Sequence, residues 1–155
     1  MQGIELSRRF YDAVVRPWLA RDFPGLSHAA ALIGYGSELL GFDDAMSQDH
    51  NWGPRIWLYL GEPDFAAHAD AIVARFAAAA PEVFEGVPVG WFNRPHLSGN
   101  GPHWRSDPRH GLEVRTLEGL VGDALGTGVD EPLSSRAWLG LAEQWLLEIT
   151  AGAVF

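Results

Sequence analysis

The chain has 155 residues, of which 47% are hydrophobic and 20% are charged, a composition typical of one globular domain. Its formal net charge of −9 argues against general nucleic-acid binding, because neutralising backbone phosphates requires a basic face. The eleven basic residues are all arginines, and the absence of cysteine excludes disulfides, thiolate zinc sites and cysteine nucleophiles. Because the sequence lacks both a signal-peptide pattern and an apolar run of the roughly 18 residues that a membrane span needs, we expect no membrane association and a cytoplasmic location.

The first half of the chain predicts two helices and two strands. Residues 4 to 21 carry apolar side chains at helical spacing, and Pro17 is expected to kink or restart this helix because it lacks an amide hydrogen. Short apolar runs at 30 to 36 and 55 to 61 predict buried strands. A second helix is predicted between Pro63 and Pro81. Its apolar stripe consists of Phe65, Ala69, Ile72, Val73 and Phe76.

The second half begins with residues 86 to 110, which are rich in proline and are predicted to be mostly loop, with one strand near Val87 to Phe92. Residues 111 to 117 predict a third strand, and Glu118 to Leu125 a short helix. The alternation of helices and strands predicts an α/β or α+β fold around one mixed sheet.

A last helix is predicted to begin at an N-cap, Ser134 or Ser135, and to continue to Ile149. The side chains that it is expected to bury are Trp138, Leu141, Trp145 and Ile149.

An acidic segment separates the first two predicted strands. Asp49 and Asn51 stand two residues apart at the entrance to the second strand, so their side chains should share one face. Beside the turn Gly36-Ser37, these oxygen ligands fit a magnesium ion shared with a substrate phosphate, which the glycine backbone can approach closely. Glu113, the one carboxylate within a later predicted strand, is the candidate third acid for a two-metal clamp at phosphorus. Asp49, Asn51 and Glu113 are expected to lie on one open edge of the sheet, with Ser37 facing them across a groove.

This arrangement resembles the active-site signature of the DNA polymerase beta-type nucleotidyltransferase superfamily. That signature is an apolar residue, Gly, Gly or Ser, a short helix, then Asp-x-Asp, with a third acid on a later strand. The run GYGSELLGFDDAMSQDHNWGPR, residues 34 to 55, is similar to an uncharacterised bacterial branch that reads GSE, GFD and S-x-DHDWGPR. The order of elements is similar over nearly the whole chain.

The resemblance implies a minimal nucleotidyltransferase fold of the α+β class, with a mixed sheet flanked by helices. It also implies transfer of a nucleoside monophosphate from a nucleoside triphosphate such as ATP to a hydroxyl or similar acceptor group, with Mg²⁺ or Mn²⁺. The acceptor would be a small molecule, a protein or an RNA. Carried over residue by residue, the nucleotide-binding positions are Gly36, Ser37 and Arg55. The catalytic and metal-binding positions are Asp49, Asn51 and Glu113.

Asn51 departs from the family pattern, which has a second aspartate at that position. An amide oxygen can bind magnesium, but it removes one negative charge and cannot act as a base. A domain that binds a nucleotide or a partner without turnover is therefore an alternative function, and the toxin of a toxin–antitoxin pair is a more remote one. Proteins of this branch resemble two-domain chains, so residues 1 to 155 are expected to be the nucleotidyltransferase part of a longer chain with a helical C-terminal domain. The sequence ends on the apolar stretch EITAGAVF, and a homodimer is the alternative to a further domain for covering it.

Structural explanations compete with several of these assignments. Asp43 and Asp44 fit a solvated loop, and Asp49 with Asn51 fits a capped strand entrance. Glu113 fits a solvent-facing acid on an edge strand. Arg55 and Arg115 fit ion pairs with the acids beside them.

The region from 91 to 110 carries further polar side chains. His96, His103 and His110 recur every seven residues, but their spacing fits no common zinc pattern, so solvated loop histidines are favoured. The three arginines of this region suit phosphate contacts or a basic loop equally well. They are Arg94, Arg105 and Arg109. The tryptophans proposed for base stacking are Trp52 and Trp91.

Overall fold

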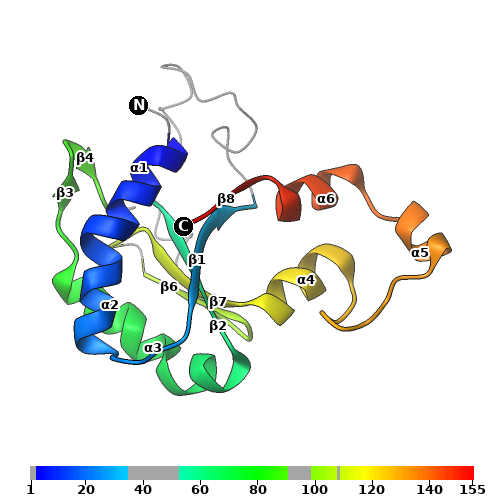
Figure 1. Ribbon diagram of the computed structural model, residues 1–155, viewed down its shortest axis with the longest axis horizontal. Helices are drawn as coiled ribbons and strands as arrows, with labels where there is room; N and C mark the ends of the chain where they lie inside the picture. The colour runs from blue at the N-terminus through cyan, green and yellow to red at the C-terminus, as the bar shows by residue number, and fades with distance from the viewer. Residues whose placement is uncertain (1–2, 35–52, 91–98, 108) are drawn as a thin grey trace.

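The computed structural model of the chain describes residues 3–34, 53–90, 99–107 and 109–155. The helices are α1 (Gly3–Phe10), the π-helical turn η1 (Tyr11–Val15), α2 (Arg16–Asp22), α3 (Glu62–Ala79), α4 (Leu117–Leu125), α5 (Ser135–Leu139) and α6 (Glu143–Thr150). The strands are β1 (Ala29–Ile33), β2 (Ile56–Leu60), β3 (Val83–Phe84), β4 (Val87–Pro88), β5 (Gly99–Gly101), β6 (Trp104–Ser106), β7 (Leu112–Thr116) and β8 (Gly152–Val154). Figure 1 shows their arrangement.

The strands form a six-stranded sheet in the order β5-β6-β7-β2-β1-β8, and β3 and β4 form a separate hairpin. The β2–β7 pair is parallel, and the other neighbouring pairs of the large sheet are antiparallel. The sheet is therefore mixed, with α1, α2 and α3 on one side and α4 and α6 on the other (Figure 1). The predicted class, a mixed sheet flanked by helices, is confirmed.

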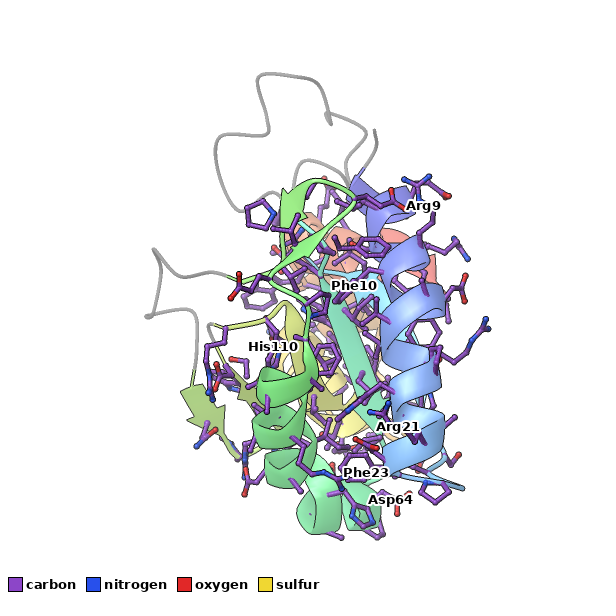
Figure 2. The ribbon with its side chains drawn as sticks, turned by 90° about the vertical axis from the view of Figure 1, so that its left-hand side faces the viewer. Arg9, Phe10, Arg21, Phe23, Asp64 and His110 are labelled. Atoms are coloured by element: carbon purple, nitrogen blue, oxygen red, sulfur yellow. The ribbon has the colours of Figure 1, made fainter. Side chains whose placement is uncertain are left out.

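The larger core lies between the sheet and the first three helices. Alternate strand residues such as Leu58 and Val114 point into it and are fully buried. All five residues of the apolar stripe predicted for the second helix are buried on α3. Phe76 of this stripe meets Phe10 and Trp18, with ring centroids 6.3 and 4.8 Å apart, so α3 packs against the N-terminal helix (Figure 2).

The N-terminal helix changes its hydrogen bonding just before Pro17. The Arg16 amide donates to the carbonyl of Tyr11, five residues earlier, which makes a π-helical turn between α1 and α2. Pro17 has no amide hydrogen with which to continue the α-helical pattern. The predicted interruption is confirmed, although the helix runs on to Asp22.

The prediction of one continuous C-terminal helix is wrong. This part of the chain consists of α5 and α6, which are separated at Gly140, while Ser134 caps α5 by accepting a 3.2 Å hydrogen bond from the Ala137 amide. The expected burial is also wrong, since Trp138 and Trp145 are 49% and 48% exposed. The break lets the two short helices take different directions, and α5 lies away from the sheet, at the outer ends of α4 and α6, in Figure 1.

The strand predicted near Val87 to Phe92 corresponds to the two-residue β4, and its hairpin partner β3 was not predicted. Sequence patterns also missed three strands of the six-stranded sheet. The region expected to be mostly loop contains the β5–β6 hairpin, which extends the sheet beside β7. At the other end, β8 pairs with β1, and the Phe155 amide donates a 2.8 Å hydrogen bond to the Ala30 carbonyl. These strands have only three residues each, too few for an alternating pattern to be recognised.

His110 is not the solvated loop residue that its surroundings in sequence suggested, since only 2% of it is exposed. Its Nδ1 accepts a hydrogen bond from the Leu112 amide, so its Nε2 carries the proton and donates to the Val73 carbonyl; both distances are 3.1 Å. Burial lowers the pKa of His110 below its ordinary value of 6.5, although Asp107 nearby acts in the opposite direction. His110 therefore joins β7 to α3 as a neutral side chain (Figure 2).

Stability should consequently fall as pH falls below about 6.5. In that range the unfolded chain takes up a proton at His110 more readily than the folded protein, so protonation favours unfolding. We expect the free energy of unfolding, measured with urea, to drop by up to about 1 kcal/mol between pH 7 and 5.5 through this residue. His110→Gln should be less stable at pH 7 but should lose that part of the pH dependence. The half-exposed His103 provides the control, and an equal loss of pH dependence in His103→Gln would contradict the assignment.

Candidate functional site

The described residues that flank the acidic segment lie toward one end of the sheet. Strand β1 runs antiparallel to β2, so Gly34, which follows β1, and Gly53, which precedes β2, lie toward the same sheet end. Strand β7 runs parallel to β2, with Glu113 opposite Trp57 near the start of both strands. Glu113 therefore lies at the sheet end where the acidic segment begins and ends. Four of the other predicted site residues lie outside the described residues: Gly36, Ser37, Asp49 and Asn51. The same holds for Asp43, Asp44, His50, Trp52, Trp91, Arg94 and His96.

Glu113 points away from the large core. Its neighbours Leu112 and Val114 are buried in that core, so the alternation of the strand places Glu113 and Arg115 on the opposite face. The expected edge position is wrong for Glu113, because β7 lies between β6 and β2. The Oε2 atom of Glu113 accepts hydrogen bonds from Nε and Nη2 of Arg115, at 3.0 and 2.7 Å.

Trp57 of β2 lies beside the Glu113–Arg115 pair, on the same face of the sheet. The Arg115 guanidinium lies 4.0 Å from the centre of the Trp57 ring, within the range of a cation–π interaction. Gly34 lies close to the six-membered ring of Trp57, because a Cβ atom built on Gly34 would come within 2.2 Å of Cη2. A pocket of about 160 Å³ opens beside these three residues, between this face of the sheet and the helices α4 and α6. Its helical wall carries two carboxylates, Asp123 and Glu148, and the half-exposed Trp145.

Two further residues, Arg55 just before β2 and Tyr59 within it, have side chains that are largely buried. Arg55, predicted to bind nucleotide, is only 2% exposed, and its backbone amide donates a 3.1 Å hydrogen bond to the Ser7 hydroxyl of α1. Tyr59 lies on the same face as Arg115, and burial raises the pKa of its phenol well above the ordinary value of 10.0. Tyr59 is therefore a neutral hydroxyl, with no hydrogen-bond partner among the described residues.

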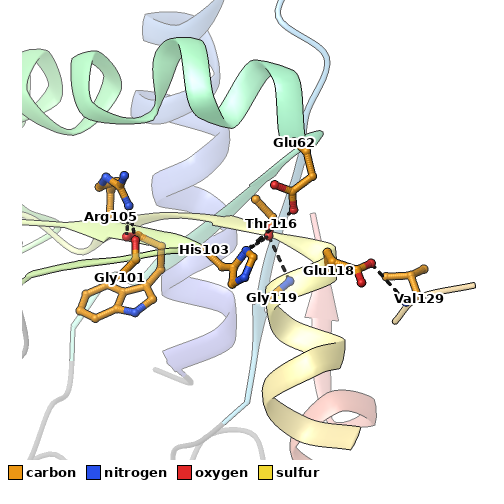
Figure 3. A network of polar contacts seen from close by, with 9 residues as sticks. Glu62, Gly101, His103, Arg105, Thr116, Glu118, Gly119 and Val129 are labelled. Carbon is orange, nitrogen blue, oxygen red and sulfur yellow. Dashed lines mark hydrogen bonds and ion pairs between the residues drawn. The ribbon is translucent and has the colours of Figure 1, made fainter. Parts of the chain in front are cut away.

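A separate polar network lies at the opposite end of β7 (Figure 3). Thr116 caps α4 by accepting a 3.0 Å hydrogen bond from the Gly119 amide, and His103 Nδ1 lies 3.4 Å from the same hydroxyl oxygen. Glu62 is 3.9 Å from His103. This network joins the start of α3, the β5–β6 turn and the start of α4, which is a structural role.

The two described arginines of the 91 to 110 region are also engaged in ion pairs. Arg105 contacts Asp70 at 2.6 Å and lies 5.1 Å from the centre of the Phe65 ring. Arg109 contacts Asp107 at 2.6 Å. These contacts favour the structural alternative over phosphate binding for both residues.

Glu113 is the one predicted metal ligand that the structure describes. Within the described residues, no group of three or more histidine or acidic side chains could hold a metal. The Oε1 atom of Glu113 has no hydrogen-bond partner in the described part of the chain. An ionised carboxylate with one unengaged oxygen suits Mg²⁺.

Sequence reasoning identified Glu113 but gave Trp57 and Gly34 no role, and it considered Arg115 only as an ion-pair partner. The period-two pattern of LEVRT predicts that Glu113 and Arg115 share a face. The contact with Trp57 depends on the pairing of β2 with β7, which a single sequence does not reveal.

Comparisons with protein-family models, with curated proteins and with solved structures give no match for this chain. No helix in the described ranges combines the length and apolar character needed to cross a membrane.

Gly34 should be difficult to replace. Its φ of +99° disfavours other residues, and a Cβ atom there would lie 2.2 Å from Cη2 of Trp57. We expect Gly34→Ala to lower the free energy of unfolding by about 2–4 kcal/mol, through backbone strain together with the clash. Urea unfolding of Gly34→Ala, Trp57→Leu and the double variant should show that Trp57→Leu relieves part of the cost.

Gly25 is the matched control, because it has a φ of +81° but nothing within 4 Å of the position that a Cβ atom would occupy. Gly25→Ala should cost only about 1 kcal/mol, the strain component alone. Equal losses at the two glycines would show that contact with Trp57 is unimportant.

Proposed function

We propose that this chain is a metal-dependent nucleotidyltransferase, which transfers a nucleoside monophosphate from a nucleoside triphosphate to an acceptor hydroxyl or similar group. The observation that carries the proposal is the position of Glu113. It lies on the face away from the large core, at the sheet end where the segment with Gly36-Ser37 and Asp49-His50-Asn51 begins and ends. The described residues that flank this segment, Gly34 and Gly53, thus lie toward the same end of the sheet as Glu113, which supports the proposal.

The finer fold proposal, a minimal nucleotidyltransferase fold, has support from strand directions. In the resemblance, the glycine-serine turn follows one strand, the acidic pair precedes the next, and a third acid lies on a later strand. Here β1 precedes the turn, β2 follows the acidic pair, and β7 carries Glu113 directly beside β2. The register brings the third acid next to the start of β2, where the pair would need it.

Each residue has a proposed role in the transfer. Gly36 and Ser37 would bind the triphosphate through the backbone and the hydroxyl. Asp49, Asn51 and Glu113 would hold Mg²⁺ or Mn²⁺, which when bound supplies a Lewis acid at the phosphoryl oxygens. Arg55, being buried, would act by fixing the entrance of β2 rather than by contacting the nucleotide.

The chemistry is an in-line displacement. The acceptor oxygen forms a bond to the α-phosphorus, and the bond from that phosphorus to the bridging oxygen breaks, so pyrophosphate leaves with the electron pair. Glu113 is the proposed acceptor of the hydroxyl proton, since the amide of Asn51 cannot accept it. Positioning and electrostatic stabilisation would supply most of the rate enhancement.

Asn51 favours a second candidate function, nucleotide binding without turnover. It lowers the negative charge available to a metal by one relative to Asp-x-Asp. A site with fewer charged ligands binds divalent cations more weakly, which reduces catalysis before it abolishes triphosphate binding.

Variants at the two positions separate these functions. Asp49→Ala should abolish metal-dependent triphosphate binding, because it removes the charged oxygen proposed as the main ligand. Asn51→Asp should tighten Mg²⁺ binding by about tenfold, because it restores a charge. Calorimetry with Mg²⁺ and a nonhydrolysable triphosphate measures both effects, and incubation with labelled triphosphates and a metabolite or RNA extract detects transfer.

Asp44→Ala is the matched control, since it removes an acid from the same segment that is predicted to lie on a solvated loop. It should leave metal and triphosphate affinity within about twofold of wild type. Normal binding by Asp49→Ala would rule out this site. Transfer found only in Asn51→Asp would identify the natural protein as a nucleotide-binding domain.

A further inference from the structure

Arg115 is held in place by an ion pair and by an aromatic ring. Both of its bonds to Glu113 end on one carboxylate oxygen, and its guanidinium lies over Trp57. Neither side chain is fully enclosed, with 21% of Arg115 and 13% of Glu113 exposed. The remaining donor, Nη1, has no partner among the described residues. The pair is thus accessible, and each partner keeps one polar atom unengaged.

We propose that Arg115 has two alternative partners: Glu113 when no metal is bound, and the triphosphate of the nucleotide when Glu113 binds the metal. This inference rests on the proposed function and names the arginine of that site. Arg115 and a divalent cation compete for the same carboxylate and repel each other. Metal binding therefore weakens the Arg115–Glu113 pair and makes the guanidinium available to phosphate oxygens, whose geometry it matches.

The surroundings of Arg115 favour a triphosphate as its second partner. Arg115 is the one cation among the described residues that line the 160 Å³ pocket, and Gly34, which leads to Gly36-Ser37, lines it as well. Asp123 and Glu148 on the helical wall would repel an anion, so phosphates are favoured on the Gly34 side, within reach of a pivoting Arg115. The Trp57 ring provides a flat surface along which the guanidinium can move while it keeps its cation–π contact.

The test uses Arg115→Gln and two binding measurements with opposite expected signs. Mn²⁺ alone should bind about fivefold more tightly to the variant, because its competitor for Glu113 is removed. A nonhydrolysable triphosphate with saturating Mg²⁺ should bind about tenfold more weakly, because a phosphate contact is lost. A purely structural ion pair would not produce opposite changes, since its loss would weaken both or neither.

The chain offers a matched control in Arg105→Gln. Arg105 is also paired with a carboxylate and lies over an aromatic ring, but it belongs to β6 and is opposite Val114, on the core side of the sheet. Both affinities should stay within about twofold of wild type in this variant. If Arg115→Gln folds poorly, Arg115→Lys replaces it, keeping the charge but not the fork. It should retain wild-type Mn²⁺ affinity and still bind the Mg²⁺–triphosphate more weakly.

Spectroscopy gives an independent readout. Titration with the nonhydrolysable triphosphate at saturating Mg²⁺ should change tryptophan emission in wild type as the guanidinium shifts across the Trp57 ring, and the change should be absent in Trp57→Phe. Unchanged Mn²⁺ affinity in Arg115→Gln, or two changes of the same sign, would overturn the two-partner role while leaving the proposed function intact. Failure of wild type to bind either ligand would overturn the proposed function and this inference together.

Discussion

The parallel pairing of β7 with β2 determines both the core and the site. In this register Leu58 lies beside Val114, and both point into the core beneath α3. The same register puts Trp57 beside Glu113 on the other face, where Arg115 can reach both. A shift by one residue would move the charged pair into the core, at a cost far above the few kcal/mol by which a domain of this size is stable. The burial of apolar side chains on one face thus fixes the acid on the other.

Elements with a long, regular pattern could be predicted from the sequence, and short elements held by tertiary contacts could not. The stripe of α3 spans several turns, so its helical period was clear and every predicted residue is buried. The strands β1 and β2 are largely apolar and β7 alternates between apolar and polar residues, each over five residues, and their positions were predicted to within a few residues. By contrast, β8 is defined by its bonds to β1, and His110 is buried by its bonds to α3 and β7. These contacts join residues far apart in the chain, and a local pattern carries no signal for them.

The candidate site, too, could be predicted only where local sequence patterns carry the information. The residue types and spacing between 36 and 51 suggested the chemistry, and the strand pattern suggested Glu113, because oxygen ligands and alternation are both local properties. The ion pair with Arg115 was among the alternatives considered, since the two residues are neighbours on one strand. The contribution of Gly34 and Trp57 required the three-dimensional pairing. The pocket beside them is lined by α4 and α6, and the apolar periodicity did not reveal that α6 is separated from α5 at Gly140.

The charge balance of the proposed site suggests an order of binding. With Asn51 in place of an aspartate, the proposed ligands carry two carboxylates, and one of these, Glu113, is neutralised by Arg115. A free divalent cation would have to displace a guanidinium to gain a single additional charged ligand, which is weakly favourable at best. A cation that arrives already bound to a triphosphate brings phosphate oxygens for its own shell and a new partner for the displaced arginine. The site would therefore select the metal–nucleotide complex over either component, so that the neutral amide of Asn51 and the ion pair of Glu113 are two parts of one electrostatic arrangement.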